Sequence, residues 1–234
     1  MGKLDNKVAI VTGAGQGIGR AIAEKLAAEG ATVVVTDINE GTAKETAEAI
    51  GGGAVGIRTD VTSRESVDAM VEQVRGQFSR IDVLVNNAGW DKAGPFVDSD
   101  PADWDRVIQI NLYGVLNTSK AVLPVMAEQG SGSVVNLASD AGRVGSSGEA
   151  VYSAAKGGVI AFTKATALAT SSGWPSRRNG MALVNASRSF SPPVLAKNAV
   201  SVGPGHTQLI DTWLRAISRA VALVKAMTPP LAAE

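Results

Sequence analysis

Apolar and polar residues alternate in blocks along the first two thirds of the chain. Short runs rich in β-branched residues, V-A-I-V-T at 8–12 and T-V-V-V-T at 32–36, are each followed by a longer stretch rich in alanine and charged residues, at 20–29 and 41–50. Short continuous apolar runs are typical of buried strands, whereas the longer stretches fit amphipathic helices. The pattern therefore predicts strand, helix, strand, helix.

The same alternation continues to about residue 169. It predicts strands at 54–59, 82–86 and 133–137, a helix over 63–78 and a long helix over 150–169. Parallel strands need a crossover that returns the chain, and a helix usually supplies it. We therefore expect an α/β protein with a Rossmann-type, doubly wound parallel sheet covered by helices on both faces.

Two helix starts carry capping signals. Thr62 and Glu65 have the spacing of a capping box before the helix at 63–78. The sequence D-P-A-D at 100–103 offers an N-cap aspartate, a proline at the first helical position and an acid in the first turn. A further helix is therefore expected to begin near Asp100.

Length and composition favour one domain over residues 1–234. The chain has 234 residues, 45% of them hydrophobic, and equal numbers of basic and acidic residues, 22 of each, so its overall charge favours neither nucleic acid nor an anionic membrane. The absence of cysteine excludes disulfides, thiol catalysis and cysteine-ligated metal, and fits a reducing compartment. Without a signal peptide or an apolar run of membrane-spanning length, we expect a soluble, cytoplasmic protein with no metal site.

The first predicted strand runs directly into a glycine-rich stretch, T-G-A-G-Q-G-I-G at 12–19, which a helix follows. Glycines there allow a tight turn and let backbone N–H groups approach a pyrophosphate at the helix N-terminus. A glycine cluster alone is also ordinary turn chemistry, but Asp37 ends the second strand about 20 residues on, as a dinucleotide site requires. A carboxylate there would bind the ribose hydroxyls and repel a 2′-phosphate, which favours NAD over NADP. The alternative is that Asp37 only caps a turn or helix.

Other polar residues follow strands at the same carboxyl edge of the predicted sheet. They include N-N-A-G at 86–89 and Ser139, while Asn111 lies within a predicted helix. Each has an ordinary explanation when taken alone: an Asn-rich turn, a serine that caps a helix, and an asparagine on a solvated helix face.

Tyr152 and Lys156 are one turn apart on the long helix over 150–169, so their side chains point the same way. An ammonium roughly 4–5 Å from a phenol, at an effective dielectric of about 20, would lower the phenol's pKa of about 10 by some 2–3 units. The phenol would then titrate where acid–base catalysis is efficient. Alone, a partly buried tyrosine beside a snorkelling lysine is ordinary.

Taken together, the motifs resemble the short-chain dehydrogenase/reductase family over roughly residues 4–169. The resemblance rests on T-G-x-x-x-G-I-G at 12–19, Asp60-Val61, N-N-A-G, Asn111, Ser139 and Y-x-x-x-K at 152–156, in this order and spacing. It implies hydride transfer between a nicotinamide, here NAD, and a small-molecule alcohol or ketone. It also favours a homo-oligomer, a dimer or tetramer, which we expect to associate through the helices that begin near Asp100 and Ala150.

The resemblance assigns roles by matching position. Tyr152 would donate or accept the proton, Lys156 would lower its pKa and hold the nicotinamide ribose, Ser139 would bind the substrate oxygen, and Asn111 would anchor a water-linked proton relay. The cofactor-binding positions would be Gly13, Gln16, Gly17, Ile18, Gly19, Asp37, Asp60, Val61, Asn87, Ala88, Gly89, Tyr152, Lys156, Gly203 and Thr207.

Within the family, residues 86–91 and 138–152 are most similar to bacterial 2-hydroxycyclohexanecarboxyl-CoA dehydrogenases, with 3-oxoacyl-ACP reductases as broader neighbours. The substrate would then be a secondary alcohol or ketone, such as a hydroxyacyl-CoA or a cyclic alcohol. Fold and catalytic residues do not fix the substrate, however.

The carboxyl end departs from the family pattern. Residues 170–196 are rich in Ser, Pro and Arg without a sustained period, so we expect them to be irregular. Residues 197–207 resemble the sixth strand and its cofactor loop, and the chain ends at Glu234 without the usual final helix and strand. An insertion, sequence divergence or a frameshift could each explain why the carboxyl-terminal part is atypical and shortened.

Two other classes of function were weighed. A serine hydrolase would need G-x-S-x-G, which is absent, and a histidine base, whereas the single histidine, His206, fits a loop. A non-catalytic dinucleotide-binding protein with a degenerate C-terminal substrate lobe remains open.

Overall fold

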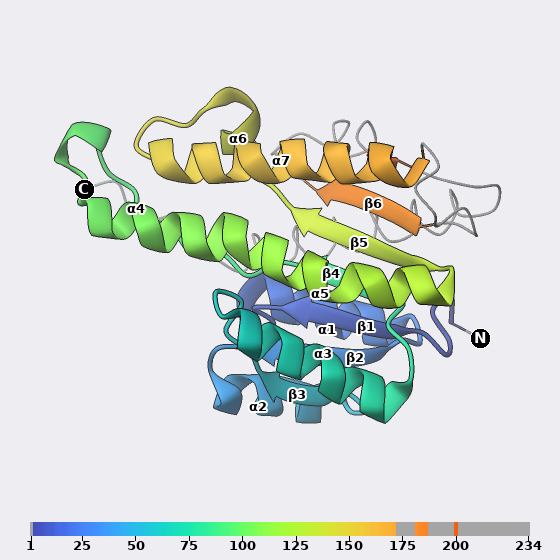
Figure 1. Cartoon of the computed structure of the whole chain (residues 1–234). Coiled ribbons are helices and arrows are strands. Elements are labelled where there is room, and N and C mark those ends of the chain that lie inside the picture. Colours follow the sequence, from blue (N-terminus) through green and yellow to red (C-terminus); the bar gives the residue numbers. More distant parts are fainter. Residues whose placement is uncertain (1, 172–180, 187–198, 201–234) are drawn as a thin grey trace.

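A computed structural model describes residues 2–171, 181–186 and 199–200, with side-chain surroundings up to residue 166. In this part of the chain one sheet has the strand order β3-β2-β1-β4-β5-β6-β7 (Figure 1). All neighbouring strands pair in parallel except β6 and β7, which are antiparallel. The strands are β1 (Val8–Thr12), β2 (Thr32–Asp37), β3 (Val55–Arg58), β4 (Val83–Asn86), β5 (Gly132–Leu137), β6 (Met181–Ala186) and β7 (Ala199–Val200).

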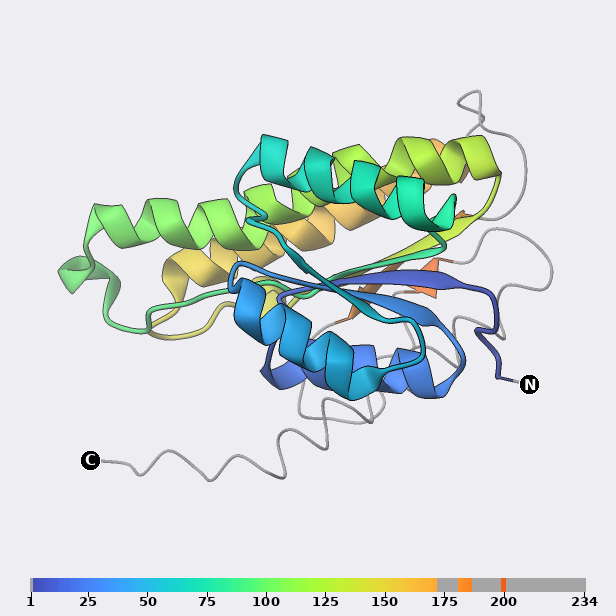
Figure 2. The same ribbon diagram turned by 90° about the horizontal axis from the view of Figure 1, so that it is seen from below.

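Helices cover both faces of the sheet, which confirms the predicted α/β architecture. Helices α1 and α2 lie on one face, whereas α3, α5 and α7 lie on the other (Figure 2). The helical segments are α1 (Gly17–Ala28), α2 (Glu40–Ile50), α3 (Arg64–Phe78), the 3₁₀ helix η1 (Phe96–Asp98), α4 (Pro101–Ile108), the π-helix η2 (Gln109–Tyr113), α5 (Gly114–Gln129), α6 (Ala141–Val144) and α7 (Ala150–Ser171).

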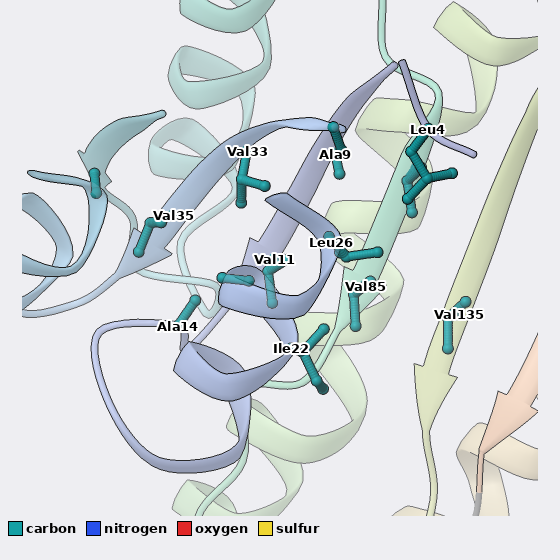
Figure 3. Packing of buried hydrophobic residues seen from close by; sticks show 14 of the residues in the cluster. Leu4, Ala9, Val11, Ala14, Ile22, Leu26, Val33, Val35, Val85 and Val135 are labelled. Atoms are coloured by element: carbon teal, nitrogen blue, oxygen red, sulfur yellow. The ribbon is translucent and has the colours of Figure 1, made fainter. Parts of the chain in front are cut away.

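Each face of the sheet carries its own apolar cluster because successive strand residues point to opposite sides. Val33 and Val35 of β2 pack with Ile22 and Leu26 of α1 on one face (Figure 3). Val34, between them in sequence, belongs to the cluster on the opposite face. Strands buried on both faces explain why the sequence shows continuous apolar runs rather than alternation.

A buried chain of polar side chains fixes the helices of the second face to the sheet. Asn86 of β4 and Asn136 of β5 are register partners, and Asn86 Nδ2 donates to Asn136 Oδ1 at 2.8 Å. Thr118 Oγ1 of α5 donates to Asn86 Oδ1 at 2.7 Å, and Asn136 Nδ2 donates to Thr163 Oγ1 of α7 at 2.9 Å. Because buried polar groups are costly when unpaired, this chain favours one placement of α5 and α7.

The predicted helix starts are confirmed at one site and corrected at the other. Asp100 caps α4, accepting from the Ala102 N–H at 2.9 Å. The N-cap of α3 is Ser63 rather than Thr62: Ser63 Oγ accepts from the Ser66 N–H at 3.2 Å. Thr62 instead binds the carboxylate of Asp60.

The expectation of an irregular segment at 170–196 is wrong in two places. Helix α7 continues to Ser171, and M-A-L-V-N-A at 181–186 forms β6, which pairs along its whole length with β5. The sixth strand therefore precedes the segment 197–207 to which the sequence assigned it, and Ala199–Val200 form the antiparallel β7 instead. The short run at 181–186 stands among Ser, Arg and Pro, so its strand character depends on pairing with β5 rather than on local pattern. Gly203 and Thr207 lie outside the described residues.

Candidate active site

The glycine-rich loop after β1 packs closely against the loop after β4. Gly13 has φ +60°, and a Cβ at this position would lie 2.9 Å from Ala88 Cα. A Cβ at Gly19 would meet the carbonyl oxygen of Gly13 and lie 2.5 Å from Asn87 Nδ2. Glycine is therefore required at both positions, by conformation at the first and by close approach at both.

The N-terminus of α1 is open to an anion in the described part of the chain. Its N-cap residue, Gln16, makes no side-chain capping hydrogen bond, and its first turn holds no acidic residue. Gln16 and Gly17 are exposed, whereas Ile18 is partly buried against the core beneath α1. Backbone N–H groups and the helix dipole suit this end for a pyrophosphate.

Thr12 joins the two loops through its hydroxyl group. Its Oγ1 accepts from the N–H groups of Asn87 and Ala88, each at 3.0 Å. In return, Asn87 Nδ2 donates to the carbonyl oxygens of Thr12 and Gly13. The remaining amide oxygen, Asn87 Oδ1, is buried and has no partner among the described residues, so it offers an acceptor to a bound donor.

Asp37 lies beside the glycine-rich loop, where a ribose-binding carboxylate is expected. Its Oδ2 accepts from the Gly15 N–H and its Oδ1 from the Asn39 N–H, both at 3.0 Å. The side chain thus serves the turn as well, so the structural and the cofactor interpretations are compatible. Arg58 is the register partner of Asp37 on β3 and brings a positive charge to the same edge.

Asp60 and Val61 form a fixed turn after β3. Asp60 Oδ1 accepts from both the N–H and the hydroxyl group of Thr62, at 2.9 and 2.7 Å. Val61 is buried, and its carbonyl oxygen accepts from Asn117 Nδ2 of α5 at 3.0 Å. No sequence motif points to Asn117, because its role depends on a contact 56 residues away along the chain.

Tyr152 and Lys156 share one face of α7, as their spacing predicted. Both are buried, and Lys156 Nζ lies 5.6 Å from the centre of the Tyr152 ring. Lys156 Nζ also donates to the carbonyl oxygen of Leu137, the last residue of β5, at 2.9 Å. The end of β5 therefore fixes the ammonium group beside the phenol.

Ser139 follows β5 by two residues, close in sequence to the carbonyl oxygen that holds Lys156. It is buried, and its Oγ accepts from the Ala141 N–H at 3.2 Å. Since a hydroxyl group has one hydrogen to donate and this contact uses only a lone pair, the hydrogen of Ser139 remains available to an acceptor in the site.

Asn111 lies in the π-helix η2 and is fully buried, so the solvated helix face considered from sequence is wrong. Its Nδ2 donates to the carbonyl oxygens of Trp90, at 2.5 Å, and Val107, at 2.9 Å. Its Oδ1 has no partner among the described residues. A Cβ at Gly89 would lie 2.9 Å from this oxygen and 3.8 Å from Lys156 Nζ, so Asn111 and Lys156 approach each other across Gly89. A π-turn often marks a functional site.

A cavity of about 190 Å³ adjoins Tyr152. The described residues around it come from the segment after β4, η1, the start of α4 and the start of α7. Sequence reasoning did not bring these residues together: it treated Tyr152 as part of the catalytic motif and Asp100 and Asp103 as helix-start signals, and they meet only in the fold. The cavity is smaller than the roughly 300–1,000 Å³ of sites for drug-sized ligands, which fits a small substrate.

The described residues offer neither a metal site nor a membrane-spanning helix. No group of three or more His, Asp or Glu side chains in this part of the chain is arranged to hold a metal ion. Among the described helices, none combines the length and apolar character needed to cross a membrane.

Comparison with known proteins agrees with the geometry. The model of a family described as short chain dehydrogenase matches residues 7–172. The chain thus belongs to the short-chain dehydrogenase/reductase family and is an oxidoreductase with a Rossmann-type nucleotide-binding fold.

The relatives include reductases of named substrate. A protein of Bacillus subtilis described as uncharacterized oxidoreductase YxbG is 40% identical over 215 residues, covering 90% of this chain and 71% of its own length. The 3-oxoacyl-[acyl-carrier-protein] reductase of Synechocystis is 45% identical over 171 residues, covering 71% of this chain and 69% of its own length. The Escherichia coli reductase FabG, of the same description, is 39% identical over 163 residues, covering 70% and 67%.

Proposed function

We propose that this protein is an NAD-dependent oxidoreductase that interconverts a secondary alcohol and a ketone. The observation that carries the proposal is the meeting of Tyr152, Lys156 and Asn111, with Tyr152 also lining a small cavity. Relatives named for the reduction of 3-oxoacyl groups support a ketone as the oxidised substrate.

The fit to a dinucleotide rests on three features of the structure. The glycine loop leaves no room for a side chain at Gly13 or Gly19, the N-cap residue of α1 makes no side-chain capping bond, and the buried Asn87 Oδ1 lacks a partner among the described residues. A bound nicotinamide supplies or takes up the hydride. Gly13, Gly19 and Asn87 would shape the cradle, and Asp37 would bind the adenine ribose.

The residues of this chain would handle the proton. In ketone reduction the Tyr152 hydroxyl group donates its proton to the carbonyl oxygen, and the Ser139 hydroxyl group donates a hydrogen bond to the same oxygen. The ammonium group of Lys156 stabilises the phenolate that remains. Asn111 Oδ1 accepts a hydrogen bond from a water molecule that returns a proton toward Lys156 and Tyr152.

NAD is proposed over NADP because of Asp37. Its carboxylate, already fixed by the Gly15 N–H, would accept hydrogen bonds from ribose hydroxyls and repel a 2′-phosphate. Arg58, on the neighbouring strand, would act in the opposite sense. Variants that neutralise Asp37 and Arg58 one at a time show which of the two charges sets the preference between NAD and NADP.

Association into a dimer or tetramer is also proposed, through α4 and α7. Their amino-terminal halves flank the cavity, so packing between subunits would stiffen its wall. Light scattering after size-exclusion chromatography of the full chain gives the mass. A monomer at micromolar concentration would contradict this proposal.

The test of function is turnover by the full chain. A panel of 3-oxoacyl thioesters, cyclic ketones and the corresponding alcohols is followed by the change in NADH absorbance. We expect ketone-dependent loss of NADH, and alcohol-dependent gain in the reverse direction. The rival, a dinucleotide-binding protein without catalysis, predicts a change in NADH fluorescence on binding but no turnover with any member of the panel.

A further inference from the structure

The cavity beside Tyr152 has an acidic lining. Among the described residues around it, five are acidic and Lys92 alone is basic. Lys92 Nζ is already paired with Asp103 Oδ2 at 2.7 Å, and Asp100 caps α4. Asp91, Asp98 and Glu149 are therefore left without a positive partner from the cavity lining, and the cavity has a net negative charge.

Two of these carboxyl groups, those of Asp91 and Glu149, form a pair across the cavity wall. Burial raises the pKa of Asp91, and so do the charge of Glu149 and a hydrogen bond with it, while the Lys92 N–H acts against the rise. When such a pair shares one proton, it still carries at least one negative charge. Its field is therefore present whichever of the two groups holds the proton.

The backbone holds this pair close to the reacting groups. Asp91 directly follows Trp90, whose carbonyl oxygen accepts from Asn111 Nδ2. Glu149 immediately precedes α7 and lies three positions before Tyr152. The Gly94 N–H donates to the Gly148 carbonyl oxygen at 2.8 Å and joins the two segments. The pair and Tyr152 consequently line one cavity.

Two aromatic side chains, those of Phe96 and Trp104, also line the cavity. Phe96 and Trp104 stack with ring centroids 5.1 Å apart and an interplanar angle of 17°. Trp104 Nε1 donates to Ser99 Oγ at 2.8 Å, which fixes its ring. A flat apolar wall beside carboxylate acceptors suits a substrate with a carbon face and groups that donate hydrogen bonds.

From this arrangement we propose that Asp91 and Glu149 are specificity-determining residues that exclude substrates with an anionic group close to the reacting carbon. The inference rests on the proposed ketone reduction and narrows its substrate to a ketone with no anionic group close to the carbonyl carbon. An anion a few ångströms from the pair is repelled, whereas an amide or hydroxyl group can donate to it.

Two isosteric ketones test this directly. Acetoacetate carries a carboxylate where acetoacetamide carries an uncharged amide of nearly the same shape. The ratio of kcat/KM for acetoacetamide to kcat/KM for acetoacetate therefore measures selection against negative charge. We expect this ratio to be about ten or more for the full chain, because two like charges a few ångströms apart in a site with little water repel each other by at least about 1.4 kcal/mol, the equivalent of tenfold. The double variant Asp91→Asn, Glu149→Gln should bring the ratio down several-fold. Glu48→Gln, an exposed acid on α2, should leave it unchanged.

A second measurement does not depend on turnover. Iodide and acrylamide both quench tryptophan fluorescence, but only iodide is charged, and subtraction of the Trp104→Phe signal isolates Trp104. We expect iodide to quench Trp104 much less than acrylamide does. In the double variant, quenching by iodide should increase relative to quenching by acrylamide. Absence of turnover with both ketones would count against the proposed function and leave the quenching to decide this inference. Equal quenching by iodide and acrylamide, or a ketone ratio unchanged in an active double variant, would overturn it.

Discussion

Lys156 Nζ lies 5.6 Å from the centre of the Tyr152 ring, and the carbonyl oxygen of Leu137 holds it there. The first contact follows from their spacing on one helix. The second requires the end of β5 to meet α7, which the sequence alone does not specify. A fixed positive charge beside a buried phenol favours the phenolate.

Replacement of this charge should slow catalysis and move its pH dependence. Lys156→Gln keeps a donor for the Leu137 carbonyl oxygen but removes the ammonium group. We expect kcat to fall by about 10²-fold or more, and the rise of alcohol oxidation with pH to move to higher pH, because the phenol then ionises less readily. The measurement is the pH profile of kcat, with circular dichroism as a check on folding. An unchanged pH profile would show that the charge of Lys156 does not influence the ionisation of the catalytic group.

Cofactor preference should follow the charge of Asp37. Asp37→Asn retains an oxygen that can accept from the Gly15 N–H but no longer repels a 2′-phosphate. We expect the ratio of kcat/KM for NADH to that for NADPH to fall about tenfold or more. Arg58→Gln is the matched variant on β3 and should change this ratio in the opposite direction. If only Arg58→Gln alters the preference, the carboxylate has been misassigned.

The hydroxyl group of Thr12 should support cofactor binding. Thr12→Val keeps the shape but leaves the N–H groups of Asn87 and Ala88 without their acceptor. We expect the Kd for NADH to rise about tenfold, since an unsatisfied N–H group costs about 1–3 kcal/mol. Thr36→Val is the control, because Thr36 is the buried register partner of Thr12 and donates only to Val11. The Kd is measured by fluorescence titration. If Thr36→Val raised the Kd for NADH as much as Thr12→Val does, the loss would not be specific to the Thr12 hydroxyl group.

Asp82 binds three neighbours at the opposite end of β4. Its carboxylate accepts from the Val8 N–H at 3.0 Å, from Arg80 at 2.6 and 2.7 Å, and from Lys7 at 3.1 Å. Burial would raise its pKa, but the hydrogen bonds from Arg80, the Val8 N–H and Lys7, together with the charge of Lys7, outweigh burial and hold the pKa below its ordinary value. A carboxyl group with a lowered folded-state pKa stabilises the fold above its unfolded pKa of about 3.9, and this stability is lost as the pH falls through the folded value.

Asp82→Asn should therefore destabilise the protein at neutral pH and matter less in acid. We expect the free energy of unfolding at pH 7 to fall by about 2 kcal/mol, the scale of buried charge-assisted hydrogen bonds, and the difference from the parent protein to shrink below about pH 4. Urea unfolding at the two pH values measures this. Glu72→Gln, whose side chain is 74% exposed, should change stability by less than about 0.5 kcal/mol. If the difference in unfolding free energy between Asp82→Asn and the parent protein were the same at both pH values, protonation of Asp82 would not contribute to acid unfolding.

The sequence predicted the fold well, and it predicted those features of the candidate site that depend on a local or periodic pattern. The strand and helix alternation, the glycine loop and the pairing of Tyr152 with Lys156 depend on neighbours in sequence. It failed at β6, because six residues flanked by Ser, Arg and Pro become a strand only through pairing with β5. It also left open a solvated position for Asn111, whose burial arises from the π-turn and from contacts with Trp90 and Val107.

Polar side chains that act across the sheet were also beyond sequence reasoning. Asn117 and Asn136 occur in no recognisable motif. Asp91 and Glu149 lie in the family-like stretches 86–91 and 138–152, but nothing in those stretches indicates that the two side chains interact. Each of the four is defined by a partner elsewhere in the fold. Side chains of this kind connect elements around the candidate site, so their partners become known only with the fold.

The most direct test of the account is Tyr152→Phe in the full chain, with turnover and NADH binding measured on the same preparation. The change keeps the buried ring beside Lys156 and removes only the hydroxyl group. We predict a loss of at least about 10³-fold in kcat for ketone reduction, with the Kd for NADH within about threefold of the parent value. Retention of more than a tenth of the parent kcat would contradict the assignment of Tyr152 as the proton donor.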